Sequence, residues 1–136
     1  GGARLPYALQ AAIAACHARA RTAEETDWVK IAALYAALSE VAPSPIVELN
    51  RGVAVAMAFG PEAGLAVIDG VAAEPVLAGY HLLPSVRGDL LFRLRRFEES
   101  RAEFERAASL TRNARERGLL QARAAQSGQH AARDDA

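Results

Sequence analysis

Few residues of this 136-residue chain have the types and spacing that catalysis or metal binding requires. Its three histidines are scattered, and none has a strong second ligand three or four positions away, so we expect no metal site. The single cysteine, Cys16, lies on an apolar stripe without a partner that would activate it, which favours a buried, inert thiol. No serine has a Gly-x-Ser-x-Gly context, and Gly60–Gly64 lacks the Gly-Lys-Ser/Thr of a phosphate loop. The sequence therefore predicts no catalytic site and no cofactor.

The remaining candidates are polar and aromatic residues that could hold a partner or a ligand. Asp27 is suited to cap a helix, and Trp28 beside it could anchor a partner at a rim, although a place in the core is favoured. Asn50 and Arg51 lie on an otherwise apolar helix, where an unpaired polar group costs about 1–3 kcal/mol. They are expected either to bond across to loops, which we favour, or to face a groove and hold a ligand. The candidate partner- or ligand-binding residues are Asp27, Trp28, Tyr35, Asn50, Arg51, Arg87 and Asp89.

These candidates support two hypotheses of different classes. The first is an interaction and regulatory domain that uses the concave side of a short helical solenoid. The second is a small-molecule sensor with a pocket on that face. An enzyme is not expected, because no constellation of reactive residues supports one. The pocket of the second hypothesis would be formed by Trp28, Tyr35, Asn50, Arg51 and Arg87.

Six or seven helices are expected to position these residues, because apolar side chains recur every three or four positions between breakers. Gly64 and Gly70, inside the fourth, are expected to mark close helix contacts, and a break is expected near Pro84. Residues 1–126 should form one helical domain, whereas residues 127–136 have too little apolar surface to order themselves and are predicted to be disordered. A loop is expected over Arg21–Thr26. The predicted helices are Pro6–Ala20, Trp28–Val41, Pro45–Gly60, one from Pro61 through Val71 that ends before Pro75, Val76–Arg95, Phe97–Leu110 and Asn113–Gln126.

Composition and charge narrow the class of protein. Lys plus Arg and Asp plus Glu are both 16, so the formal net charge is zero and nothing indicates direct nucleic-acid binding. One cysteine excludes an internal disulfide, and the apolar run Val53–Phe59 is far too short to span a bilayer. A reducing, cytoplasmic setting fits these features. Because the chain begins with Gly1 and Gly2 rather than with Met, we expect it to be part of a longer protein.

The spacing of small and large residues predicts a helical repeat. In the window His81–Ala114, Gly88 and Ser100 stand where paired helices would cross, and Phe104 would fill the gap between repeats. These spacings resemble the 34-residue tetratricopeptide pattern. A looser copy runs from Asn50 to Ile68, and Trp28 begins the second helix of a first copy. The predicted fold is all-α: a tetratricopeptide-like, right-handed solenoid of about three helix pairs with a C-terminal capping helix.

Several separate stretches, in order, carry a more specific likeness that covers nearly the whole chain except its C-terminal tail. Together they resemble the C-terminal extension of one group of extracytoplasmic-function sigma factors, a tetratricopeptide-like domain. The stretches are PYALQAAIAACHA at Pro6–Ala18, TDWVKI at Thr26–Ile31, PSPIVELNR at Pro43–Arg51, GPEAGL at Gly60–Leu65, and the segments Gly79–Leu94 and Phe97–Ala107.

The resemblance implies a function for the parent protein and a role for this segment. In the family, sigma region 2 binds the promoter −10 element and the polymerase clamp, and region 4 binds the −35 element; neither region is present here. The implied partners of the extension are the parent's own regions 2 and 4, RNA polymerase, or both, and it takes the place of a separate anti-sigma factor. The family commonly has Arg-Leu-Gly-Arg where this chain has Arg93–Arg96, and losing that glycine should strain or loosen the turn before Phe97.

Overall fold

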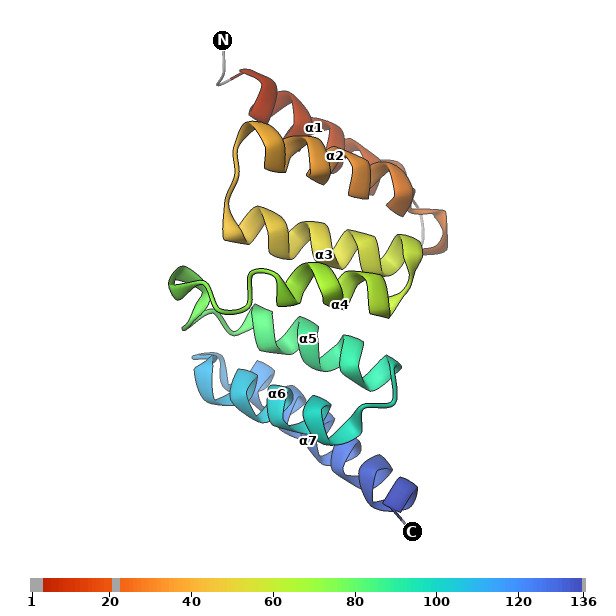
Figure 1. The fold of residues 1–136 in the computed structure, drawn as a ribbon, viewed down its shortest axis with the longest axis vertical. Helices are drawn as coiled ribbons and strands as arrows, with labels where there is room; N and C mark the ends of the chain where they lie inside the picture. Colours follow the sequence, from red (N-terminus) through yellow and green to blue (C-terminus); the bar gives the residue numbers. More distant parts are fainter. Residues whose placement is uncertain (1–3, 21–22, 136) are drawn as a thin grey trace. The chain divides into compact units, whose positions relative to one another are not determined.

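Helices form all the regular structure of the computed structural model, which describes residues 4–20 and 23–135. Within those residues there are seven α-helices, two short 3₁₀ helices and no β-strand (Figure 1), so the all-helical prediction is confirmed. The chain divides into two units, Gly1–Val71 and Ala72–Ala136, and each is described by itself. The elements are α1 (Arg4–Arg19), η1 (Ala23–Glu25), α2 (Trp28–Val41), α3 (Pro45–Phe59), α4 (Pro61–Asp69), η2 (Pro75–Leu77), α5 (Leu82–Arg93), α6 (Phe97–Leu110) and α7 (Ala114–Asp135).

In the first unit, α1 to α4 run back and forth, and each packs mainly against its neighbour in the chain (Figure 1). The predicted cap of α2 is confirmed, and α3 starts in a similar way. The Asp27 carboxylate accepts a hydrogen bond from the backbone N–H of Lys30 at 3.1 Å, and the Ser44 hydroxyl accepts from two N–H groups in the first turn of α3. Within the predicted loop before α2, residues 23–25 form η1, and residues 21 and 22 lie outside the described residues.

The core of the first unit lies between α1, α2 and α3. Its buried members are apolar residues of all three helices, and Cys16 is one of them with 5% exposure, as predicted. Trp28 and Tyr35 of α2 pack partly buried against this core. The fully or nearly buried residues of the cluster are Ile13, Cys16, Ile31, Ala32, Leu38 and Ala54.

Two glycines let α3 and α4 approach unusually closely. A Cβ on Gly64 would lie 2.4 Å from the Cβ of Ala56 and 2.7 Å from the carbonyl oxygen of Gly52. A Cβ on Gly52 would lie 2.5 Å from Cγ1 of Ile68, so neither position has room for a side chain. The predicted close contact at Gly64 is therefore confirmed. Gly70, in contrast, is exposed at the end of α4, and the prediction of a helix contact there was wrong.

Gly60 joins α3 to α4 without an intervening loop. It ends α3 and directly precedes α4, with φ of 106°, a backbone conformation that favours glycine. Pro61 follows at the first position of α4, where a missing N–H removes no intrahelical hydrogen bond. The α3–α4 hairpin therefore depends on this Gly-Pro pair. α4 ends at Asp69, earlier than predicted, since it was expected to run through Val71 and end before Pro75.

The second unit holds η2 and α5 to α7, again with each long helix packed against the next. The sequence predicted one helix over Val76–Arg95 with a break near Pro84. The break instead lies before Leu82, and Pro84 is inside the helix that follows. The chain forms η2, turns, and starts α5 at Leu82, which places Pro84 in the first helical turn. Proline is tolerated there because its nitrogen would have no intrahelical acceptor. Pro84 therefore lies in the first turn of α5, and its ring is buried.

The turn between α5 and α6 confirms the expected strain. Arg95 has φ of 61°, the left-handed conformation in which glycine is usual. Its N–H donates to the carbonyl of Phe92 at 3.0 Å, and the N–H of Arg96 donates to the carbonyl of Leu91 at 2.9 Å. These two bonds form a Schellman motif that ends α5. Arg95 therefore stands at the position of the missing glycine and holds a conformation that its side chain disfavours.

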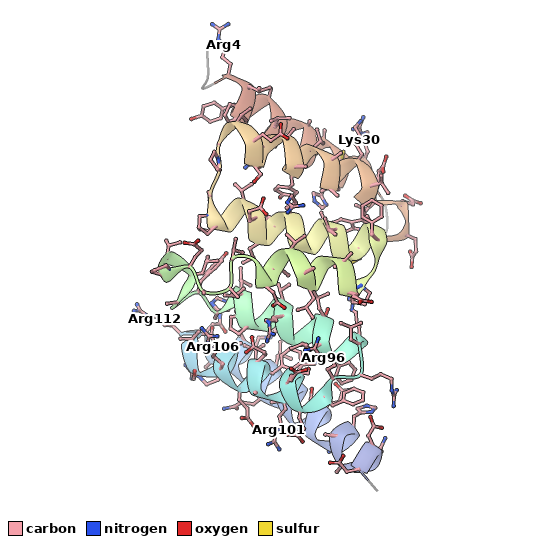
Figure 2. The ribbon with its side chains drawn as sticks, viewed as in Figure 1. Arg4, Lys30, Arg96, Arg101, Arg106 and Arg112 are labelled. Carbon is pink, nitrogen blue, oxygen red and sulfur yellow. The ribbon has the colours of Figure 1, made fainter. Side chains whose placement is uncertain are left out.

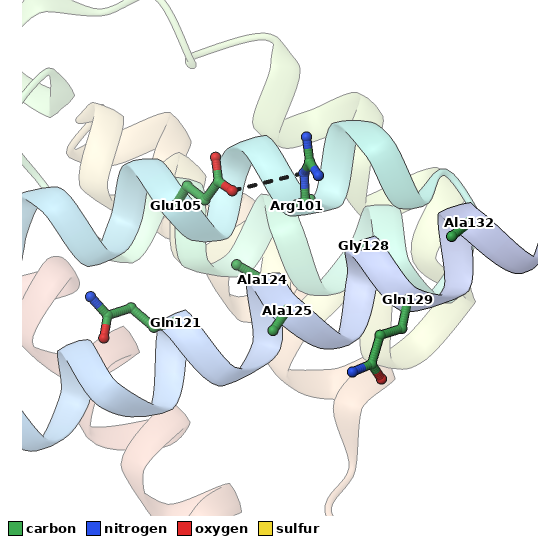
Figure 3. Close-up of a pocket in the computed structure, with 8 residues that line it drawn as sticks. All are labelled: Arg101, Glu105, Gln121, Ala124, Ala125, Gly128, Gln129 and Ala132. Carbon is green, nitrogen blue, oxygen red and sulfur yellow. Dashed lines mark ion pairs between the residues drawn. The ribbon is translucent and has the colours of Figure 1, made fainter.

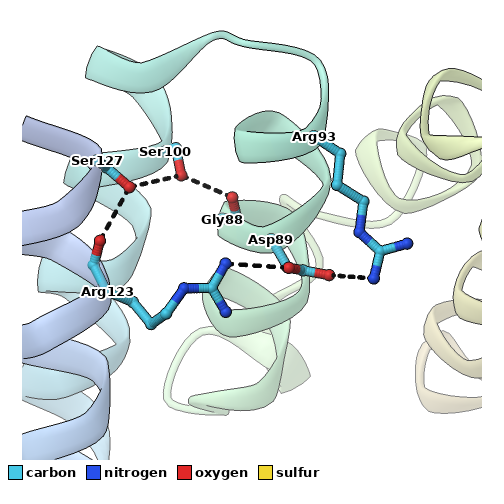
Figure 4. A network of polar contacts seen from close by, with 6 residues as sticks. All are labelled: Gly88, Asp89, Arg93, Ser100, Arg123 and Ser127. Carbon is cyan, nitrogen blue, oxygen red and sulfur yellow. Dashed lines mark hydrogen bonds and ion pairs between the residues drawn. The ribbon is translucent and has the colours of Figure 1, made fainter. Parts of the chain in front are cut away.

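The contact between α5 and α6 uses the residues that the repeat pattern singled out. A Cβ on Gly88 would lie 3.0 Å from the ring of Phe104. The Ser100 hydroxyl is fully buried and donates to the carbonyl of Gly88 at 2.7 Å, and it also contacts the hydroxyl of Ser127 at 3.2 Å (Figure 4). The single proton of the Ser127 hydroxyl can go to Ser100 or to the carbonyl of Arg123, which lies 3.0 Å from it. Hydrogen bonds between buried groups thus connect α5, α6 and α7.

The predicted disorder was wrong for residues 127–135, because α7 continues to Asp135, and residue 136 lies outside the described residues. Ser127 and Ala131 are buried, and His130 stacks on the ring of Phe97 with centroids 4.8 Å apart. Disorder was predicted because residues 127–136 have little apolar surface. This end of α7 instead packs through small side chains and one imidazole. The start of α7 agrees with the prediction, since the Asn113 side chain accepts from the N–H of Glu116 at 2.9 Å.

Candidate interaction surface

The two units differ in the character of their surfaces. Residues 1–71 hold only five of the 16 Lys and Arg and seven of the 16 Asp and Glu. The same unit carries seven of the ten exposed large hydrophobic side chains among the described residues. In the second unit, long cationic side chains such as Arg101, Arg106 and Arg112 extend from the surface (Figure 2). An apolar contact surface is therefore to be sought in the first unit.

One face of α3 combines exposed apolar side chains with one of the predicted site residues. Ile46 and Met57 are 44% and 39% exposed, and Asn50 between them is exposed as well. Together with half-buried Val53 they follow a spacing of four, three and four residues, which places all four on one side of the helix. We call these four residues the α3 face. Asn50 is its only hydrogen-bonding side chain, with two donors and one acceptor.

Arg51, next to the α3 face, is already engaged. Its guanidinium binds the carboxylate of Glu48 through two nitrogens, at 2.9 and 3.0 Å, and Ser39 of α2 donates to the same carboxylate. The hydrogen bond from Arg51 lowers the pKa of Glu48 below its ordinary value, and burial opposes this effect. The same bond raises the pKa of Arg51. The prediction that Arg51 bonds to loops was wrong, because its partner lies one turn earlier on its own helix.

Asp27, Trp28 and Tyr35 have structural places on α2. Asp27 caps the helix as predicted. Trp28 packs against the core, with its ring edge-on to His17 at 5.4 Å between centroids, and its buried Nε1 has no hydrogen-bond acceptor among the described residues. Burial raises the pKa of Tyr35, whose ring packs against the same core cluster. The core reading of Trp28 therefore agrees with the structure.

Arg87 and Asp89 belong to the second unit and pair within it. Arg87 on α5 lies 3.7 Å from the carboxylate of Glu103 on α6. Asp89 binds Arg93 at 3.0 Å on its own helix and Arg123 of α7 at 3.1 Å (Figure 4). The guanidinium of Arg123 also lies over the ring of Phe104, 4.7 Å from its centroid. Both candidates therefore join helices of one unit, and of the five residues in the predicted small-molecule pocket only Arg87 is outside the first unit.

A groove that the sequence did not indicate runs between α6 and α7. Arg101 and Glu105 of α6, 3.8 Å apart, line one side of it. The opposite side is formed by α7 (Figure 3). The short side chains that line this groove are of the same types as those buried between helices. No signal in the sequence could therefore have identified the groove. The α7 residues that line it are Gln121, Ala124, Ala125, Gly128, Gln129 and Ala132.

Two further properties bear on the class of protein. No group of three His, Cys, Asp or Glu side chains within residues 4–20 and 23–135 is arranged to hold a metal ion. Every helix in the described part of the chain is too short or too polar to cross a lipid bilayer.

Comparison with known proteins gives one informative relative. An uncharacterized protein of Rhizobium meliloti is 48% identical over 115 residues, a match that covers 85% of this chain and 27% of that protein. The chain thus spans little more than a quarter of the length of this relative. No family model matches the sequence, and no solved structure matches it.

Proposed function

We propose that this chain is a non-catalytic interaction and regulatory domain of an extracytoplasmic-function sigma factor, whose parent directs promoter recognition by RNA polymerase. The observation that carries the proposal is the ordered set of sequence stretches from Pro6 to Ala107 that resembles the C-terminal extension of that family. The partners that follow from it are the parent's own sigma regions, RNA polymerase, or both. On this reading the chain acts in the cytoplasm and does not itself bind nucleic acid.

A repeated contact supports the tetratricopeptide-like part of the proposal. Gly52 contacts Ile68 and the backbone of Gly64 in the first unit, and Gly88 contacts Phe104 and Ser100 in the second. Three pairs of residues correspond at a separation of 36 positions: Gly52 and Gly88, Gly64 and Ser100, and Ile68 and Phe104. The same crossing of a helix pair therefore occurs twice, as expected for stacked repeats in which small residues let paired helices approach.

The α3 face is the surface that we assign to the partner. It is apolar and carries no charge of its own, and Glu48 and Arg51 beside it neutralise each other. Covering Ile46 and Met57 would remove apolar area from water, which favours association. Asn50 would then need partner groups for its amide, because leaving them unpaired costs about 1–3 kcal/mol. This requirement makes the contact selective.

The test is promoter output from the full-length protein that carries this segment. A reporter driven by a promoter of that protein is compared between the complete protein and one from which residues 1–136 of this chain are removed. We expect output to change, because the segment regulates the sigma regions. Ile46→Glu with Met57→Glu should reproduce the change, whereas Ala122→Glu, on an exposed position of α7, should not. Unchanged output after complete removal would contradict the proposal.

No observation favours the small-molecule hypothesis in the same way. Arg51 is held by Glu48, and Trp28 and Tyr35 pack against the core of the first unit. It stays a prediction that thermal-shift screening of metabolites would test.

A further inference from the structure

α7 carries the same kind of small residues that α3 uses to pack against α4. On α3, a Cβ added to Gly64 of the next helix would lie 2.4 Å from the Cβ of Ala56 and 2.7 Å from the carbonyl oxygen of Gly52. Ala124 and Gly128 occupy the corresponding places on α7, each 72 positions further along the chain. That separation is twice the 36 positions that relate the two helix crossings described above. α7 therefore has, in reverse order, the small pair of the first helix of a crossing.

This small pair faces the groove between α6 and α7 (Figure 3). Ala124 and Gly128 both line the groove. In each complete crossing, the first helix packs its small residues against the helix that follows it, α3 against α4 and α5 against α6. The part of the chain that the structure describes has no further helix on this side of α7, where Ala125, Gln129 and Ala132 are exposed. The groove therefore has the form of the first half of a helix crossing.

The two complete crossings define what the second helix presents. α4 carries Gly64 and, one turn later, Ile68, whereas α6 carries Ser100 and, one turn later, Phe104. In both, a small residue is followed four positions later by a large apolar one, and both contact the first helix. Small residues permit the close approach, and the large side chain fills the space beside them. An occupant of the groove should carry the same spacing.

The α6 side of the groove adds a charge to this description. Arg101 lies between two acids, 3.6 Å from Glu98 and 3.8 Å from Glu105. Both distances are longer than a hydrogen bond, so the carboxylates can accept from another donor, and the three side chains together have one negative charge in excess. On the α7 side, the polar lining residues Gln121 and Gln129 are uncharged. A basic residue on the occupant, directed towards α6, would therefore pair with a carboxylate.

The groove of a second copy of this chain does not meet these requirements. Two such grooves placed face to face would bring together short side chains and glutamines, with no large apolar residue to fill the space between them. The acidic excess of one copy would also lie near that of the other, which opposes association. The spacing and the charge thus favour a helix of a different protein.

We propose that the groove between α6 and α7 binds one α-helix of a partner protein, which carries a small residue, a large apolar residue four positions later, and a basic residue directed towards α6. Bound there, this helix forms with α7 a further crossing of the kind seen in α3–α4 and α5–α6. The inference rests on the repeated crossing that supports the tetratricopeptide-like part of the proposed function, and not on the promoter role. The reporter experiment and a binding experiment therefore fail independently.

The experiment measures the binding of three synthetic peptides of about 14 residues to the complete 136-residue chain. Each is held helical by a side-chain link on its outer face, because an isolated helix of this length is marginal in water. The first carries Ser, Phe four positions later, and Lys on the neighbouring face. In the second, Phe is moved by two positions and so lies on another side of the helix. In the third, Glu replaces Lys.

Fluorescence anisotropy of the labelled peptides follows binding. We expect the first peptide to bind at least about tenfold more tightly than the second, with the third between them, and we expect high salt to bring the first and third together. Equal binding of the first and second, or no binding of any, would overturn the proposal. Equal binding of the first and third at low salt would refute the part assigned to the acidic side chains of α6.

Two variants locate the contact. Ala125→Arg places a long cationic side chain in the groove and should weaken binding of the first peptide by at least about tenfold. The position is exposed and arginine is a good helix former, so the fold should survive, and circular dichroism checks this. Ala122→Arg, exposed on α7 but outside the groove lining, is the matched control and should leave binding unchanged. Unaltered binding by Ala125→Arg would refute the assignment, and so would a dimer in sedimentation that Ala125→Arg abolishes, since a second copy would then occupy the groove.

Discussion

Arg95 shows how a single residue can oppose the conformation that its surroundings impose. Its backbone completes the Schellman motif at the end of α5, while its side chain makes an exposed ion pair with Asp134 at 3.2 Å and lies over the ring of Phe97. Exposed ion pairs contribute little, typically below about 1 kcal/mol. A left-handed backbone costs a residue with a side chain about 1–2 kcal/mol. The free-energy cost of the left-handed backbone is therefore larger than the stabilisation that the guanidinium contributes.

Replacing Arg95 by Gly should accordingly stabilise the protein. We expect the free energy of unfolding to rise by about 0.5–1 kcal/mol, because relief of the positive φ exceeds the greater entropy of a glycine in the unfolded chain. Urea denaturation measures the change. Arg95→Ala is the matched control: it removes the guanidinium and keeps the strained backbone, so it should not stabilise. A stabilisation of equal size in both variants would show that the side chain, not the backbone, is unfavourable.

Gly64 is the place for the reverse substitution, in which a glycine is replaced by a residue with a side chain. Its missing side chain is where α4 touches the backbone of α3, and Gly64→Ala would place a Cβ 2.4 Å from that of Ala56. We expect a loss of about 2–3 kcal/mol in the free energy of unfolding, since neither contacting group can rotate away. Gly118→Ala on α7, where nothing lies within 4 Å, should gain about 0.5–1 kcal/mol instead. Thermal unfolding of both variants checks the difference, and a neutral Gly64→Ala would contradict the close approach.

At the scale of elements, the contacts between helices depend on small side chains and a few polar ones. α5, α6 and α7 meet through Gly88, Ser100 and Ser127. The two serine hydroxyls are buried, and their partners are each other and the backbone carbonyls of Gly88 and Arg123. α2 and α3 are linked by the carboxylate of Glu48, which accepts from Ser39 and Arg51. Helix positions are thus fixed by specific partners as well as by apolar area.

The last turns of α7 provide a test at this scale. Removing residues 127–136 should destabilise the chain by about 2–4 kcal/mol, because it deletes the buried Ser127 and Ala131 and uncovers the Phe97 ring under His130. Removing only residues 132–136 is the control, and it should cost less than about 1 kcal/mol since residues 132–135 are exposed. Equal stabilities of the two truncated chains in urea would contradict the ordered end of α7.

The link between α2 and α3 predicts a dependence on pH. Because Arg51 and Ser39 lower the pKa of Glu48, the charged carboxylate stabilises the fold above its ordinary pKa, and this contribution is lost as the pH falls through the lowered value. Glu48→Gln should therefore be less stable than the native chain at neutral pH, with a difference that shrinks on acidification. Urea denaturation across the acid range measures it. A Glu62→Gln variant, at an exposed acidic position of α4, should show no such convergence. A difference independent of pH would exclude the proposed role of the charge.

At the scale of the whole molecule, each unit has its own network of neighbouring helix contacts. In proteins built of stacked helix pairs, stability is close to a sum of local terms and nearest-neighbour interfaces. A defect should then act mainly where it is placed.

Hydrogen exchange of the Gly64→Ala variant tests this locality. Amide exchange should accelerate in α3 and α4 of the first unit, with a smaller effect in α5 to α7, because the altered crossing belongs to the first unit alone. Mass spectrometry of peptic fragments resolves the two units. A uniform acceleration through the whole chain would show instead that the chain unfolds as one cooperative body.

The sequence predicted the helical class and most boundaries because caps, prolines and apolar spacing act locally. Asp27, Ser44 and Pro61 stand where their chemistry requires. What it missed depends on contacts distant in the chain. Residues 127–135 are ordered by aromatic rings of earlier helices, and the partner of Arg51 could not be chosen between loops and its own helix without the fold. Of the candidate site residues, Asn50 alone proved to lie on the exposed α3 face, with Ile46 and Met57 as its neighbours.

Gly60 is the only residue between α3 and α4, so the connection cannot absorb a change in length. One inserted residue there would turn the following helix by about 100° about its own axis. Gly64 would then no longer face Gly52. A residue with a side chain would take its place, where a Cβ has no room. The length of the chain at Gly60 is therefore constrained. Insertions in homologous proteins are expected in the longer loops between other helices.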